Sequence, residues 1–197
     1  YLMRVLGPVE FGRFAFGSAG AGLLGVLVDY GFNQVGTKQV ACASEKGPFR
    51  ASIFWSVQIA KLLLAVCFIP LLGGLAWLLG LYRDYGGILP AALAGAASAW
   101  MFPQWFLQGT QRYRTLAASL AAARVLSAIA TVWLVDSRED AVIAVLLVAS
   151  TGCVAGLLAV AIGNMHRELS PVWPGWMDCA RQIRLGLPLF ISTVAIS

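Results

Sequence analysis

The sequence predicts an all-α, polytopic membrane helix bundle, and three observations support this. Hydrophobic residues make up 59% of the chain and charged residues only 12%, with a mean hydropathy of +0.79, far from the average of soluble domains. Apolar runs long enough to cross a bilayer recur along the chain. Short polar segments separate these runs. The chain starts at Tyr1 without Met and ends inside a fresh apolar run, so we expect it to be part of a longer protein.

The apolar runs define the expected membrane spans, which lie at about 11–32, 51–82, 88–108, 115–135 and 141–165, with a further run starting at 185. Residues 1–10 are expected to form a loop, because Leu6-Gly7-Pro8 interrupts a helix. The polar stretch 33–50 is expected to be a second loop with room for a short surface helix. A third polar segment, 166–184, leads into the last run.

Small residues at helical spacing mark faces where two helices can approach closely. They form a stripe in the first run (Gly17, Ala21, Gly25), an Ala and Gly cluster in the third run (91–97), and a pair in the fifth (Gly152, Gly156). Helix packing is the favoured interpretation of these positions.

The third run becomes aromatic and broken in its second half. Pro103 removes a backbone hydrogen bond and leaves the carbonyl of Ala99 free, so a kink is expected near this point. Trp100, Phe102, Trp105 and Phe106 are typical of an interfacial aromatic belt, which is the favoured interpretation.

Arg124 lies near the middle of the run 115–135, roughly 14 Å from its start on a helix. A lone arginine at the bilayer centre costs at least ~2.5 kcal/mol, so its side chain should face protein or a watery cavity. Either Arg124 pairs with a neighbouring helix to hold the bundle together, or it lines a polar translocation path. We favour the path, because intramembrane charges are usually functional.

Two further charges belong to this question. Lys61 lies ten residues into the run 51–82, where a partner, a polar cavity or snorkelling to the surface would each accommodate it. Asp29 closes the first run, where a capping role and a functional role are equally compatible with its place.

Other kinds of site are not indicated. The net charge of +5 comes from basic residues scattered singly between apolar runs, which indicates membrane topology and no nucleic-acid partner. The four cysteines share no short spacing, and the single histidine, His166, has no evident partner. We therefore expect no catalytic residue, no metal and no cofactor.

Positive residues also predict the orientation. The segments 33–50, 108–114 and 164–184 hold eight Lys and Arg, whereas the alternate segments 1–13, 83–87 and 136–140 hold four. The first set is therefore expected on the cytoplasmic side.

Four segments carry a resemblance to a known family. They read YLMRVLGPVEFG at 1–12, DYGFNQVGTKQVA at 29–41, PQWFLQG at 103–109 and GLPLFIS at 186–192. In this order the chain resembles the polysaccharide-unit flippases, or O-antigen transporters, of the multidrug/oligosaccharidyl-lipid/polysaccharide exporter superfamily. Gln111 and Lys38 depart from a glutamate and an arginine that are common in that family.

The resemblance implies a two-lobe transporter that works by alternating access in the bacterial inner membrane. Residues 1–184 would form most of the N-terminal six-helix lobe, without its first helix, and 185–197 would start the second lobe. The implied cargo is an oligosaccharide linked to undecaprenyl diphosphate. Arg124 and Lys61 are the candidate cavity residues for it, and Asp29 is a candidate for ion coupling or pairing. The implied partners are membrane lipid, a proton or sodium ion, and polysaccharide polymerases.

Three alternatives remain open at this point. A multidrug or toxin exporter would share the fold and the alternating access. A membrane-embedded enzyme of lipid-linked sugar assembly would handle a related cargo but should carry acidic or histidine residues on outward loops. A purely structural membrane subunit explains Arg124 least well.

Overall fold

The computed structural model describes residues 1–43, 48–163 and 172–196, and every regular element in this part of the chain is a helix. The predicted all-α polytopic bundle is therefore confirmed. The elements are α1 (Leu2–Asp29), α2 (Phe32–Cys42), α3 (Pro48–Leu78), α4 (Leu81–Tyr85), α5 (Ile88–Met101), α6 (Gln104–Gly109), α7 (Tyr113–Leu134), a 3₁₀ turn η1 (Arg138–Asp140), α8 (Ala141–Ala149), α9 (Thr151–Gly163) and α10 (Trp176–Ile196).

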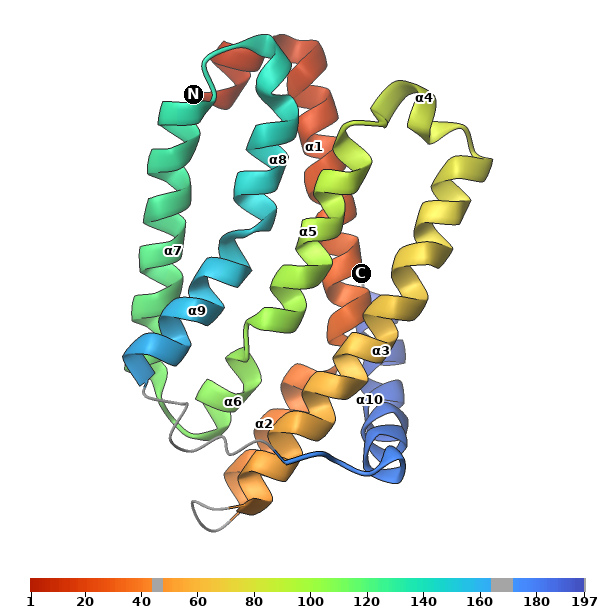
Figure 1. Ribbon diagram of the computed structural model, residues 1–197, viewed down its shortest axis with the longest axis vertical. Helices are drawn as coiled ribbons and strands as arrows, with labels where there is room; N and C mark the ends of the chain where they lie inside the picture. Colours follow the sequence, from red (N-terminus) through yellow and green to blue (C-terminus); the bar gives the residue numbers. More distant parts are fainter. Residues whose placement is uncertain (44–47, 164–171, 197) are drawn as a thin grey trace.

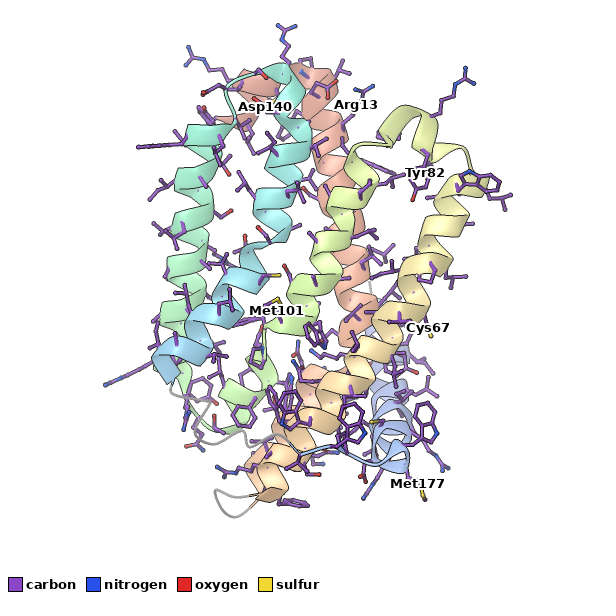
Figure 2. The ribbon with its side chains drawn as sticks, viewed as in Figure 1. Arg13, Cys67, Tyr82, Met101, Asp140 and Met177 are labelled. Atoms are coloured by element: carbon purple, nitrogen blue, oxygen red, sulfur yellow. The ribbon has the colours of Figure 1, made fainter. Side chains whose placement is uncertain are left out.

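The long helices run side by side, so the polar segments gather at two ends of the bundle (Figure 1). The N-terminus, α4 and η1 lie at the upper end, and α6 and the far end of α2 lie at the lower end. Figure 2 shows Arg13 and Asp140 at the upper end and Met177 near the lower one. The two sets of segments that differ in positive charge therefore lie at opposite ends.

Four stretches of the described chain are long and apolar enough to cross a membrane, namely Leu2–Asp29, Phe49–Leu78, Tyr113–Leu134 and Ala141–Gly163. The last of these consists of α8 and α9, which meet at Ser150. The run 88–108 forms two shorter helices, because α5 ends at Met101 and Phe102 adopts an extended conformation before Pro103. The kink expected there is present.

Two segments expected to be loops are helical. Residues 2–6 are helical and precede a break at Gly7. The φ of 74° and ψ of 174° of Gly7 lie outside the helical region. Only the break itself was predicted correctly. The stretch 33–50 contains α2, the short helix for which the sequence left room; Lys38 and Cys42 are exposed on one side of it, and Gly36 and Val40 are buried on the other.

The aromatic residues after Pro103 are core residues, so the prediction of an interfacial belt is wrong for them. Trp105 and Phe106 are almost fully buried and pack on Phe54 of α3, with ring centroids 5.8 Å and 5.3 Å from it. Gly36 of α2 lies against the Trp105 ring, where an added Cβ would come within 2.5 Å of it. Thr37 donates a hydrogen bond to the Trp105 carbonyl at 3.1 Å. Two of the segments that carry the family resemblance thus pack against each other.

The final helix starts earlier than the apolar run at 185. α10 begins at Trp176, and Asp178 in its first turn accepts a hydrogen bond from the Gly175 N–H at 3.2 Å. The polar part of α10 is helical because one face of it is buried, with Cys179 and Gln182 more than nine-tenths covered. His166 lies outside the described residues.

Small residues of α1 and α9 pack against α5 on two sides, in the close approach that such residues predicted. Ala21 of α1 lies against Gly95, where an added Cβ would be 2.5 Å from the Ala21 carbonyl oxygen. On the other side, Gly152 and Gly156 of α9 lie against Ser98 and Met101. The backbones of α1, α5 and α9 are therefore in near contact, which is the packing that small residues allow in a bilayer.

The turn before α8 is stabilised by a carboxylate. Asp140 accepts hydrogen bonds from the backbone N–H groups of Ser137, at 2.8 Å, and Asp136, at 3.2 Å, and from the Ser137 hydroxyl at 2.8 Å. The backbone hydrogen bond from Ser137 has the largest effect in lowering the pKa of Asp140 below its ordinary value of 3.8, followed by the Ser137 hydroxyl.

This lowered pKa predicts a pH dependence. The charged carboxylate contributes stability that is fully present above the pKa of the unfolded chain and is lost as pH falls through the lower folded value. We expect Asp140→Ala to lower the thermal midpoint at about pH 7, and the difference from the parent chain to shrink toward about pH 3. Thermal unfolding in detergent measures both, and a difference that grows on acidification would contradict the assignment.

The packing around α5 predicts a second effect. Gly95→Ala should lower the free energy of unfolding by about 1–3 kcal/mol, because the new Cβ meets backbone atoms that cannot rotate away. Gly12→Ala is the matched control, since a Cβ at Gly12 meets no atom within 4 Å. Denaturation of both variants followed by tryptophan fluorescence tests this, and equal stability of the two would refute the close contact.

Candidate functional site

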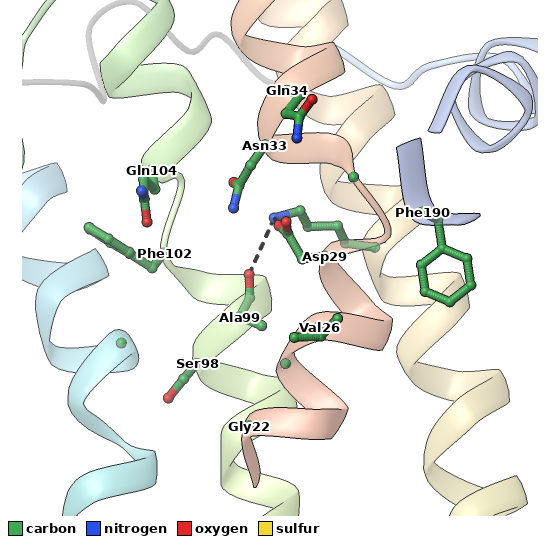
Figure 3. A pocket seen from close by; sticks show the side chains of 14 residues that line it. Gly22, Val26, Asp29, Asn33, Gln34, Ser98, Ala99, Phe102, Gln104 and Phe190 are labelled. Carbon is green, nitrogen blue, oxygen red and sulfur yellow. Dashed lines mark hydrogen bonds and ion pairs between the residues drawn. The ribbon is translucent and has the colours of Figure 1, made fainter. Parts of the chain in front are cut away.

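An ion pair between a buried lysine and a partly exposed aspartate lies where α1, α3 and α5 meet. The Lys61 ammonium is 2.8 Å from an Asp29 carboxylate oxygen, and the Lys61 side chain is only 1% exposed. Lys61 Nζ also donates to the Ala99 carbonyl at 3.4 Å, the contact drawn in Figure 3. The sequence placed these charges on separate runs, and the fold brings them into direct contact.

Local sequence explains how each partner is presented. α1 ends at Asp29 because Tyr30 and Gly31 adopt left-handed conformations, with φ of 47° and 80°, before α2 restarts at Phe32. Pro103 has no N–H to donate to the Ala99 carbonyl, so this oxygen is available to Lys61. The carbonyl that the sequence predicted to be free thus accepts a hydrogen bond from the buried ammonium.

A second contact holds α3 against α5 beside this pair. Gln58 donates from Nε2 to the Trp100 carbonyl at 3.0 Å, and the Trp100 indole donates back to the Gln58 carbonyl at 3.0 Å. Two reciprocal hydrogen bonds fix the register between the helices, so the height of Lys61 relative to Ala99 is fixed as well.

The ion pair lines a cavity of about 540 Å³ between α1, α2, α5 and α6. Three carboxamide side chains, those of Asn33, Gln34 and Gln104, also line it, together with Ser98 and Phe102. Figure 3 shows Asn33 and Gln104 reaching into the same space from different segments, next to Asp29. We call this space the amide cavity.

Helix α10 reaches the edge of the amide cavity. Phe190 of α10 lines it and stacks on Tyr30, with ring centroids 4.6 Å apart. Gly31 lies directly against α10, where an added Cβ would be 2.9 Å from the Leu189 Cβ. The turn that follows Asp29 therefore also packs against α10.

Arg124 lines a different cavity, of about 850 Å³, formed by the start of α1 together with α7, α8 and α9. Ser127 and Thr131 lie on the same face of α7, and most of the remaining lining is apolar. The Arg124 side chain is exposed. Its guanidinium makes no ion pair or hydrogen bond with any residue that the structure describes. We call this space the arginine cavity, and it shares no lining residue with the amide cavity.

The structure therefore brings two of the three predicted site residues together and leaves the third apart. Asp29 and Lys61 form one unit, and Arg124 stands in its own cavity. Sequence reasoning missed Asn33, Gln34 and Gln104, although each carboxamide follows a helix break, either the Tyr30-Gly31 turn or Pro103. A polar side chain directly after a break in an apolar region is the signal that could have identified them.

Comparison with known proteins gives a consistent result over the full length of the chain. Residues 1–197 match the family described as "Polysaccharide biosynthesis protein". An Escherichia coli (strain K12) protein named "Putative O-antigen transporter" is 30% identical over 197 residues, which cover 100% of this chain and 48% of the relative. A Shigella dysenteriae protein of the same name is 25% identical over 201 residues, covering 100% of this chain and 49% of the relative.

The chain thus spans about half the length of the curated relatives it matches. No solved structure matches it.

The ion pair generates a stability prediction. Lys61→Met should lower the free energy of unfolding by about 1–3 kcal/mol, because the Asp29 carboxylate loses its counter-charge but keeps a quarter of its side-chain surface exposed. The double variant Lys61→Met/Asp29→Asn should regain most of this loss. Denaturation in detergent micelles measures the three proteins.

Arg13→Ala is the matched control, because Arg13 and Glu10 form an exposed pair at 2.8 Å. Its loss should change stability by less than about 1 kcal/mol. If Lys61→Met were as mild as Arg13→Ala, the buried pair would not stabilise the fold.

Proposed function

The chain belongs to the polysaccharide biosynthesis protein family, and on that premise we propose that it is part of a flippase for lipid-linked oligosaccharide. The proposed cargo is an oligosaccharide on undecaprenyl diphosphate, an O-antigen or exopolysaccharide unit, moved across the bacterial inner membrane. The names of the curated relatives support a transporter rather than an enzyme.

Arg124 is the observation that carries this proposal. A pyrophosphate cannot enter hydrocarbon without counter-charge, and charge-assisted hydrogen bonds from a guanidinium are the strongest that a side chain offers to phosphate oxygens. Arg124 lies in the middle of a helix long enough to span the membrane, faces a cavity, and has no partner among the described residues. We therefore assign it to the pyrophosphate.

Lys61 and Asp29 have a different role in the proposal. Lys61 lines the amide cavity as a cation that is already paired, so it can meet an anionic group only when Asp29 releases it. Binding of a proton or a sodium ion at Asp29 would weaken the pair and free the ammonium. This makes Asp29 the candidate for ion coupling. Gly31, two residues later, packs against α10, so a movement at Asp29 would be passed on to that helix.

The proposed architecture is the two-lobe arrangement with alternating access. Residues 1–184 would belong to the N-terminal lobe, and 185–197 would begin the second. The end of the bundle that carries α2 and α6 would face the cytoplasm, because the more positive segments lie there. Polysaccharide polymerases remain the proposed protein partners on the opposite side.

Loss of the guanidinium tests the function. Arg124→Ala should abolish surface polysaccharide in a strain that lacks its own flippase and is complemented by the intact gene, while the amount of protein in the membrane stays normal. The protein level should hold because the side chain makes no contact that the fold needs. Immunoblotting and staining of surface polysaccharide measure the two quantities.

Arg114→Ala is the control, an exposed arginine at the start of the same helix, and should leave polysaccharide unchanged. Equal loss of protein and polysaccharide in Arg124→Ala would indicate a structural role instead. Failure of the intact gene to complement, together with resistance to toxic cations, would indicate a drug exporter of the same superfamily.

A further inference from the structure

The amide cavity differs from the arginine cavity in its charge. Among the residues that the structure describes, the charged ones that line it are Asp29 and Lys61, which neutralise each other at 2.8 Å. Lys61 Nζ additionally donates to the Ala99 carbonyl. Two of the three N–H donors of the ammonium are therefore used within the protein, and one remains for a ligand. An anion entering this cavity would have to displace Asp29, whereas an uncharged ligand meets no such competition.

The remaining polar groups of the cavity are suited to hydroxyl groups. A carboxamide presents one acceptor oxygen and two N–H donors, and Asn33, Gln34 and Gln104 supply three such groups around one space. A sugar hydroxyl both donates and accepts, as does an acetamido group, whereas a phosphate only accepts. Phe102 adds an apolar wall of the kind that cavities for small ligands usually have.

Asn33 lines the cavity, and one of its side-chain atoms lacks a partner. The Oδ1 oxygen of Asn33 is buried and accepts no hydrogen bond from any described residue. The volume of about 540 Å³ lies in the range of about 300–1,000 Å³ that is usual for small-ligand sites.

We propose that the amide cavity is the sugar subsite and that it takes an uncharged sugar bearing hydroxyl or acetamido groups. This inference rests on the proposed function, because it divides one cargo between two places. The sugar lies among Asn33, Gln34 and Gln104, and the pyrophosphate lies at Arg124. The subsite therefore selects against uronic acids, whose carboxylate would meet Asp29 and an occupied Lys61.

Gly22 offers a way to block this subsite without disturbing the protein. Gly22 lines the amide cavity, and a Cβ added there meets no atom within 4 Å. The side chain in Gly22→Leu would therefore project into the cavity from α1 and fill space that the sugar needs. Replacing a glycine inside a helix also favours the helix itself.

Saturation-transfer NMR on the full chain in lipid nanodiscs tests the proposal, with the methyl glycosides of N-acetylglucosamine and glucuronic acid as probes. The N-acetylglucosamine glycoside should bind at least about tenfold more tightly than the glucuronide. Gln104→Ala should weaken its binding about tenfold, the effect of about one lost hydrogen bond. Gly22→Leu should abolish it, and Gln104→Arg should move the preference toward the glucuronide.

Gln108→Ala is the matched control, a carboxamide on the same helix α6 that does not line the cavity, and should bind like the parent chain. Thermal unfolding of each variant confirms that a loss of binding is not a loss of fold. Equal binding of the two glycosides, or full binding by a folded Gly22→Leu, overturns the inference. Normal complementation by the intact gene in that case would leave the proposed function standing, whereas binding without complementation would overturn the function instead.

Discussion

The need to pair one buried ammonium organises this bundle. Removing Lys61 from water costs several kcal/mol unless its charge is compensated and its donors are used. The compensation comes from two other helices, through the Asp29 carboxylate on α1 and the Ala99 carbonyl on α5. A single side chain of α3 therefore sets the position of α1 and α5 together. Both partners are available only because α1 ends at Asp29 and α5 lacks a donor at Pro103.

Close backbone packing makes this pairing geometrically possible. α5 lies between α1 and α9, and glycine and alanine at the crossings let the three backbones approach. In a bilayer, helices gain little from burying apolar side chains against each other, so dispersion contacts between close backbones and a few polar contacts must hold them. The motif residues Gly36, Trp105 and Gly109 belong to the same kind of packing, at the contact between α2 and α6. They carry the family resemblance as structural residues.

Breaks in the helices shape the amide cavity but not the arginine cavity, and the two cavities differ in chemistry. At the amide cavity, the Tyr30-Gly31 turn and Pro103 interrupt two helices at one level, and polar residues after each break face the gap. The charges there cancel. At the arginine cavity, α7 continues without interruption, and Arg124 projects from an intact helix into a mostly apolar recess. For the cargo that we propose, the charged site would take the pyrophosphate and the neutral one the sugar.

Much of this organisation follows from the sequence alone. Hydropathy determined the helical membrane class, Pro103 determined the kink and the free carbonyl of Ala99, and the small-residue stripes determined which helix faces meet. These are local properties, because a bilayer leaves the backbone few alternatives to the helix and proline acts on its own turn. Sequence reasoning was wrong for the start of α10 and for Trp105, where polarity or aromatic character suggested a surface and tertiary burial overrode it. Only the tertiary structure decided that Asp29 contacts Lys61, that three carboxamides line the same cavity, and that Arg124 stands apart. Each of these depends on how distant helices are rotated and shifted relative to one another. The residue pattern of a single helix does not contain that information.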